Sequence, residues 1–198
     1  MDKPKLKKYL LDISMDDTET GVDYVALVDD PAIMVNWMAF ANQSKEHSFK
    51  VSDKDKQIIS GPLMIPNMDI FRKGKEGDLD HYVQFSNDSI FTIVRKFFRD
   101  RNTSNVNIMH DSAEIPKDVY MIESFIIDDS RMSKPKGFED LPNGTWFGSY
   151  KIDNPIIWQA VKDGLFKGFS VQGNFIPQSF SKSRDELVLS QIIDILNS

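Results

Sequence analysis

The sequence predicts an α+β fold whose core is a largely antiparallel β-barrel or sandwich, with about three helices around it. Short apolar segments separated by turn residues recur along the chain, which is typical of β-rich domains. A few segments follow the helical period instead. The two kinds of segment do not alternate regularly, so a parallel sheet of βαβ units is not expected. The 198 residues are enough for one hydrophobic core, and we interpret residues 1–198 as a single domain.

The composition excludes several classes of function. Apolar residues make up 40% and charged residues 27%, as in soluble globular proteins, and the net charge of −6 disfavours nucleic-acid binding. No apolar stretch is long enough to span a membrane and no signal peptide is recognisable, so we expect a soluble cytoplasmic protein without membrane partners. There is no cysteine, and the three histidines form no zinc motif. We therefore expect neither a metal nor a cofactor.

The predicted strands of the N-terminal half are short and end at turn residues. Residues 1–21 are an N-terminal arm or contain the first strand, because apolar residues alternate over Lys7–Ser14. Gly61 and Pro62 lie inside an apolar segment and predict a bulge or a barrel corner there. The other predicted strands are Val22–Val28, His47–Val51, Gln57–Asn67, Asp69–Arg72 and His81–Phe85.

Three helices are predicted. Over Asn87–Asp100, apolar residues recur at i, i+3, i+4 and i+7. A second helix begins at Asn154-Pro155, a favoured cap, and ends at Gly164. The third occupies residues 183–198, where Ser183 and Glu186 form a capping box.

The C-terminal half supplies the remaining strands. A polar loop, Asp128–Asn143, separates two of them, and Pro177–Lys182 is interpreted as a linker. The predicted strands are Asn105–His110, Val119–Ile127, Thr145–Ile152 and Leu165–Phe175.

Ser170 is the candidate nucleophile. It lies in a predicted strand between Gly168 and Gly173, where missing side chains would let a peptide approach the backbone. The spacing is not the Gly-x-Ser-x-Gly elbow of α/β-hydrolases, so that fold is disfavoured. Backbone N–H groups around Ser170 are candidate oxyanion donors, and Arg184 is a candidate side-chain donor. The alternative is a small residue in a tightly packed strand.

His110 is the candidate base. A serine needs a base near neutral pH, and histidine is the usual one. Val106, Ile108 and His110 share a face of the predicted strand, so His110 ends an apolar row. His47 and His81 lie in polar or charged surroundings. The alternative is a strand-end histidine that is hydrogen-bonded to a neighbour.

Glu123 is the candidate orienting acid. It lies in the middle of a segment that is apolar on both faces, where an unpaired carboxylate is costly to bury. Antiparallel pairing across the preceding turn could bring it to His110, which would relieve that cost. The alternative is a structural ion pair with an arginine. Weaker candidates are Asp111, Glu186 and Asp194.

Four segments together resemble the tailed-phage prohead (capsid maturation) proteases, and among them the XkdF-like serine proteases. These segments are ISGPLMIPN at 59–67, NIMHD at 107–111, IESFIID at 122–128 and WQAVKDGLFKGFSVQG at 158–173. The resemblance covers about residues 22–175. The serine and histidine segments are specific only in combination.

The resemblance implies a fold similar to the herpesvirus assemblins, a β-barrel wrapped by helices. It implies an endopeptidase that cleaves scaffold and major capsid proteins, and often itself, in the host cytoplasm within the procapsid. Ser170 then matches the family nucleophile and His110 the family base. The third member varies across the group, so Glu123 depends on the burial argument alone. The alternative function is a non-catalytic virion assembly protein with the same barrel, and a homo-oligomeric state is left open.

Overall fold

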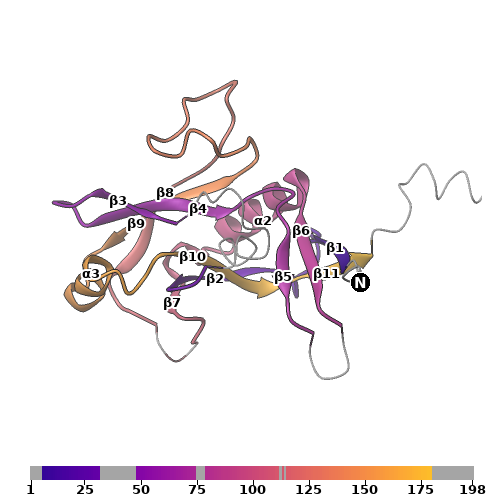
Figure 1. Ribbon diagram of the computed structural model, residues 1–198, viewed down its shortest axis with the longest axis horizontal. Coiled ribbons are helices and arrows are strands. Elements are labelled where there is room, and N and C mark those ends of the chain that lie inside the picture. Colours follow the sequence, from indigo (N-terminus) through magenta and orange to yellow (C-terminus); the bar gives the residue numbers. More distant parts are fainter. Residues whose placement is uncertain (1–5, 32–47, 75–78, 112, 114, 180–198) are drawn as a thin grey trace, which may run out of the picture.

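The structure, a computed structural model, describes residues 6–31, 48–74, 79–111, 113 and 115–179 (Figure 1). This part of the chain is mainly β. Its strands are β1 (Lys7–Asp12), β2 (Gly21–Val28), β3 (Lys50–Asp53), β4 (Ile58–Met64), β5 (Ile70–Arg72), β6 (His81–Phe85), β7 (Val106–Ile108), β8 (Val119–Ile126), β9 (Trp146–Ile152), β10 (Gly168–Asn174) and β11 (Ile176–Ser179). Its helices are α2 (Asn87–Arg99), α3 (Pro155–Lys162) and the short 3₁₀ helix η1 (Asn102–Ser104).

The prediction of a closed barrel surrounded by three helices is wrong for the part of the chain that the structure describes. The strands form three open sheets, in the orders β11-β1-β6-β5, β10-β2-β7 and β3-β4-β9-β8. Two α-helices are present in the described ranges, and the helix predicted for 183–198 lies outside them. Apolar alternation identifies a strand and its buried face, but it carries no information on which edges pair.

The sheet β10-β2-β7 determines which residues meet at the site. β10 pairs antiparallel with β2, and Ser170 lies opposite Ala26. β7 pairs parallel with β2 on the other side, and Asn107 lies opposite Ala26. Because directly paired residues share a face of a sheet, Ser170, Ala26 and Asn107 form one row across three strands.

β7 is shorter than predicted, and this changes the position of His110. The strand ends at Ile108, and Met109 and His110 both have left-handed backbone conformations, with φ of 50° and 61°. The N–H of Asp111 then donates to the carbonyl of Ile108 at 2.8 Å, which closes a tight turn. His110 therefore does not end the apolar row of a strand. The turn sets its direction.

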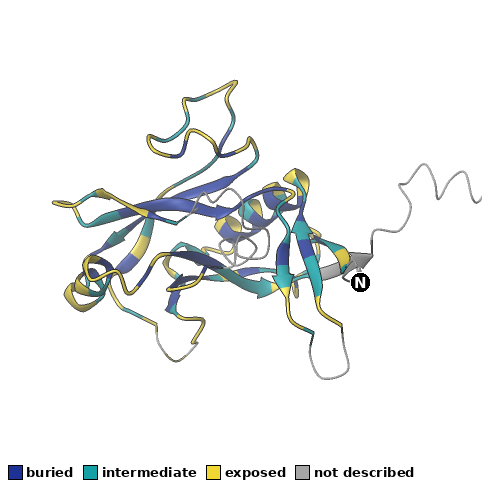
Figure 2. Cartoon of the chain, viewed as in Figure 1, coloured by how far each residue is buried: buried dark blue, intermediate teal, exposed yellow. Residues whose placement is uncertain are grey.

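The hydrophobic core lies between the sheets and α2 (Figure 2). The inner face of α2 includes Ile90, Ile93 and Phe97, all fully buried, and the Phe97 ring packs edge-on against Trp146 with 5.1 Å between ring centres. Ser86 caps this helix by accepting from the N–H of Ser89 at 3.0 Å. The predicted apolar stripe over this helix is therefore confirmed for these three residues, whereas Phe91 and Phe98, also assigned to it, are exposed.

Two further strand details test the sequence interpretation. The pairing of β4 with β9 shifts register between Pro62 and Met64, so the predicted irregularity at Gly61-Pro62 is confirmed. The linker predicted for Pro177–Lys182 is wrong at its start, because β11 pairs with β1 and lies at the edge of its sheet. An edge position tolerates Pro177, whose missing N–H would disrupt a central strand. No helix among the described residues has the length and apolar character needed to cross a membrane.

Candidate active site

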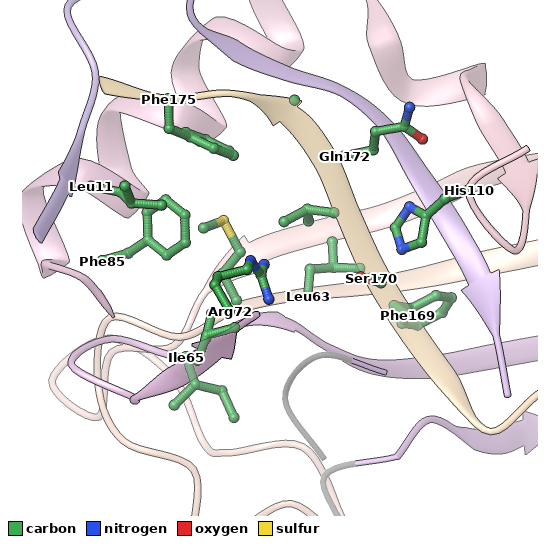
Figure 3. Close-up of a pocket in the computed structure, with 14 residues that line it drawn as sticks. Leu11, Leu63, Ile65, Arg72, Phe85, His110, Phe169, Ser170, Gln172 and Phe175 are labelled. Carbon is green, nitrogen blue, oxygen red and sulfur yellow. The ribbon is translucent and has the colours of Figure 1, made fainter. Parts of the chain in front are cut away.

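A pocket of about 250 Å³ is lined by residues from all three sheets (Figure 3). Residues from β1, β4, β5, β6 and β10 line it, together with the turn after β7. Most of the lining is apolar. The polar side chains that line it are Arg72, His110, Ser170 and Gln172. The candidate nucleophile and the candidate base therefore face the same cavity.

Ser170 is placed by the helix and strand around it. Asn154 caps α3 by accepting from the N–H groups of Ile156 and Ile157, and Gly164, with a φ of 73°, ends the helical turn before β10 begins. The Ser170 side chain is 6% exposed and lines the pocket. Its hydroxyl has no hydrogen bond to another side chain in the part of the chain that the structure describes.

The glycines beside Ser170 serve packing. A Cβ on Gly168 would lie 2.5 Å from the ring of Pro31, and one on Gly173 would lie 1.8 Å from the carbonyl oxygen of Gly21. Both distances are far below van der Waals contact, so neither position tolerates a side chain without movement of its neighbours. The expectation that these glycines open the strand to a peptide is therefore wrong. They let β10 approach β2 and Pro31.

His110 projects its ring into the pocket from the left-handed turn. Burial lowers the pKa of His110 below its ordinary value, a hydrogen bond with the Gln172 side chain raises it, and the positive charge of Arg72 lowers it further. The net direction is downward, which favours the neutral imidazole that can accept a proton. Among the described residues, no hydrogen bond joins this ring to the Ser170 hydroxyl. In substrate-free enzymes such bonds are often long and tighten only when the substrate binds.

Gln172 and Asn107 form a polar connection behind His110 that the sequence analysis missed. Asn107 is completely buried, and its side-chain amide donates to Oε1 of Gln172 at 2.7 Å. Gln172 in turn contacts His110. The Asn107 Oδ1 is buried without a hydrogen-bond partner. Two signals pointed to these residues: Gln172 follows Ser170 by two positions on the same strand face, and Asn107 is the polar residue between two apolar ones in β7.

The structure does not bring Glu123 to the pocket. Glu123 is exposed on β8, the edge strand of another sheet, where it pairs with Ser149 of β9. The interpretation of Glu123 as a buried carboxylate is wrong, because one face of this edge strand is open and also exposes Tyr120 and Ile122.

The other candidate acids do not replace Glu123. Asp111 is exposed, and its carboxylate accepts from the N–H of Ala113 at 2.8 Å. Glu186, Asp194 and the candidate oxyanion donor Arg184 lie outside the described residues. Among the residues that the structure describes, no group of three or more His, Asp or Glu side chains could hold a metal ion.

The backbone of β10 offers an N–H group beside Ser170. Val25 and Leu27 of β2 direct their backbone groups towards the β7 side, with hydrogen bonds of 3.0 Å each. Neighbouring residues of a strand alternate in direction, so Ala26 and its partner Ser170 direct their backbone groups towards each other. The N–H of Val171 therefore points away from β2, towards the open edge of β10 in the described sheet. It is a candidate oxyanion donor next to the nucleophile.

A comparison with protein families gives one match. Residues 45–176, about two thirds of the chain, match the family described as "Putative phage serine protease XkdF". No curated protein and no solved structure matches the chain. The matched range contains the pocket residues Arg72, His110, Ser170 and Gln172. On this match, the chain belongs to the phage serine protease family XkdF.

Proposed function

We propose that this protein is a serine endopeptidase in which Ser170 is the nucleophile and His110 the general base. The observation that carries the proposal is the pocket that both side chains line, within the range that matches a phage serine protease family. The lowered pKa of His110 supports the role of base, because the ring is then neutral near pH 7. The Ser170 hydroxyl, which has no side-chain hydrogen bond among the described residues, supports the role of nucleophile.

The proposed reaction follows the general course of acyl transfer. His110 accepts the hydroxyl proton while Ser170 Oγ attacks the carbonyl carbon of a peptide bond. The Val171 N–H stabilises the resulting oxyanion. His110 then donates the proton to the leaving amine as the C–N bond breaks, which leaves an acyl-enzyme. Water, deprotonated by His110, cleaves the ester and restores the Ser170 hydroxyl.

We propose phage scaffold and major capsid proteins as the substrates, cleaved within the procapsid in the host cytoplasm, with self-cleavage as part of the same activity. The phage origin of the family supports this assignment. The test is incubation of the purified protein with the scaffold and capsid proteins of the same phage. New N-termini, mapped by mass spectrometry, are expected with wild type and absent with Ser170→Ala.

Fluorophosphonate labelling tests the nucleophile directly. Wild type should form an adduct on the peptide that contains Ser170, and Ser170→Ala should form none. Ser60→Ala is the matched control: Ser60 is 7% exposed, so it is about as buried as Ser170, but its hydroxyl contacts those of Ser52 and Ser149 at 2.8 Å, outside the pocket. Ser60→Ala should label like wild type. An unlabelled wild type, or equal labelling of Ser170→Ala, would refute the proposal and favour a non-catalytic assembly protein.

A further inference from the structure

The pocket contains a permanent cation that the proposed reaction does not use. Arg72 ends β5, at the edge of a different sheet from Ser170, and it lines the pocket with His110 and Ser170. Figure 3 shows its guanidinium directed into the cavity, between Phe85 and the strand that carries Ser170. The charge and the candidate nucleophile therefore lie in one small cavity.

No carboxylate compensates this charge in the part of the chain that the structure describes. Among the residues that the structure describes, no Asp or Glu lines the pocket, and the guanidinium donates from its Nη1 to the carbonyl of Phe71 at 3.1 Å. Asp69, three residues earlier, is already engaged with Lys8 and Gln84, each at 2.5 Å. Arg72 is exposed to solvent, and partial desolvation of its side chain lowers its pKa. Because the guanidinium lines the pocket, its charge is available to an anion that enters.

We propose that Arg72 forms a subsite for a carboxylate of the substrate, supplied by an Asp or Glu side chain close to the cleaved bond. This inference rests on the proposed protease function. The planar guanidinium can bind a carboxylate through two parallel hydrogen bonds. The apolar walls, which include Leu11, Ile70 and Phe85, suit the methylene groups of an acidic side chain. A pocket of about 250 Å³ has room for few side chains, so the acid must lie near Ser170.

A bound carboxylate would also assist the reaction. The charge of Arg72 lowers the pKa of His110 and so opposes formation of the imidazolium that the reaction requires. Neutralising Arg72 with a substrate carboxylate removes that opposition. Acidic substrates should therefore react faster once bound, in addition to binding more tightly.

Peptidyl phosphonate probes test the subsite without knowledge of the natural cleavage site. Each probe has blocked ends and carries Glu or Gln at one of the successive positions before the phosphorus. At one position the Glu probe should label Ser170 about tenfold or more faster than the Gln probe, as expected for charge-assisted hydrogen bonds. Arg72→Gln should abolish this preference, and Arg72→Glu should reverse it in favour of a Lys probe. The control is Arg101→Gln, an exposed arginine outside the pocket.

A small fluorophosphonate without a peptide separates failure of the subsite from failure of the function. If it labels Ser170 in wild type and in Arg72→Gln, but the Glu preference is missing or survives Arg72→Gln, the subsite inference is wrong. If it does not label wild type, the proposed function itself is wrong. The carboxylate at the C terminus of a peptide substrate presents the same group to Arg72 as a Glu side chain. Preference for peptides with a free C terminus, without any effect of an internal Glu, would overturn the assignment to an internal acid.

Discussion

Lys96 and Arg72 carry the same charge but differ in their hydrogen-bond partners. Lys96 is 2% exposed on α2, and its ammonium donates to the backbone carbonyl of Ser14 at 3.1 Å and to those of Asp17 and Thr20. Its three donors thus have three acceptors inside the protein. Arg72 faces a cavity, and its hydrogen bond among the described residues is to the adjacent residue's carbonyl. Lys96 holds a loop through these bonds, whereas Arg72 is the cation that we propose to bind a substrate carboxylate.

The buried serines also differ in their hydrogen-bond partners. Ser60 and Ser149 hydrogen-bond each other across β4 and β9, whereas Ser170 lines the pocket. Polar groups that satisfy one another stabilise a core, and those left open at a cavity are available for chemistry. The following experiments test this contrast, in order of decreasing effect.

The largest effect is expected for substitution of His110, and His81 serves as its control. His110→Ala should lower hydrolysis by about 10³-fold, within the range for loss of a general base. His81→Ala should leave the rate unchanged, because His81 lies outside the pocket, where it packs edge-on against Tyr9 at 5.2 Å and contacts the carbonyl of Leu79 at 3.1 Å. Initial rates on a cleaved phage protein measure both. An equal loss of rate in the two variants would contradict the role of His110 as general base.

The two cations should differ in stability. Lys96→Met leaves three carbonyl groups, one buried and two partly buried, without their donor and should lower the free energy of unfolding by about 3 kcal/mol. Arg72→Met should change it by less than about 0.5 kcal/mol, since the bond that is lost is an exposed one to the adjacent Phe71 carbonyl. Urea unfolding followed by tryptophan fluorescence gives both values. A larger loss for Arg72→Met than for Lys96→Met would reverse the assignment of the two roles.

Substitution of Asn107 should lower the rate of hydrolysis with little effect on stability. Asn107→Leu removes the amide that holds Gln172, so hydrolysis should fall by about tenfold, as for loss of an outer-shell partner. The same change also removes a buried unsatisfied oxygen, so the free energy of unfolding should change by less than about 1 kcal/mol. Kinetics and urea unfolding on one preparation test this. Gln172→Glu should restore the orientation of His110 in the Asn107→Leu background if positioning is the cause.

The smallest effect is expected in the pH profile. His110 must be neutral to act as base, and its pKa is lowered, so the acid limb of kcat/KM should have its midpoint below 6.5, the ordinary pKa of histidine. Arg72→Gln removes a positive charge that lowers this pKa, so the midpoint should move to higher pH. The Arg101→Gln profile should match wild type. A downward shift in Arg72→Gln would contradict the electrostatic argument.

The sequence predicted the local elements well where one physical signal dominates. Helical periodicity and caps located α2 and α3, and alternation located β6 at His81–Phe85, as the structure has it. Ser170 and His110 were selected by chemistry, and both line the pocket.

The failures concern properties that depend on distant residues. The closed barrel is wrong because sheet edges are paired by tertiary contacts, and the buried Glu123 is wrong because an edge strand leaves one face open. The left-handed turn at Met109 and His110 has no glycine to announce it, and such a conformation costs about 1 kcal/mol or more per residue. Gln172 and Asn107 are far apart in sequence and meet only because β2 lies between their strands.

That position of β2 has a practical consequence. Residues 21–28 lie outside the range 45–176 that defines the family match, yet they form the strand that joins the serine strand to the histidine turn. A fragment trimmed to the matched range would contain Ser170 and His110 but lack the strand that lies between β10 and β7. An expressed fragment of this protein should therefore include β2, although this strand lies outside the range that matches the family.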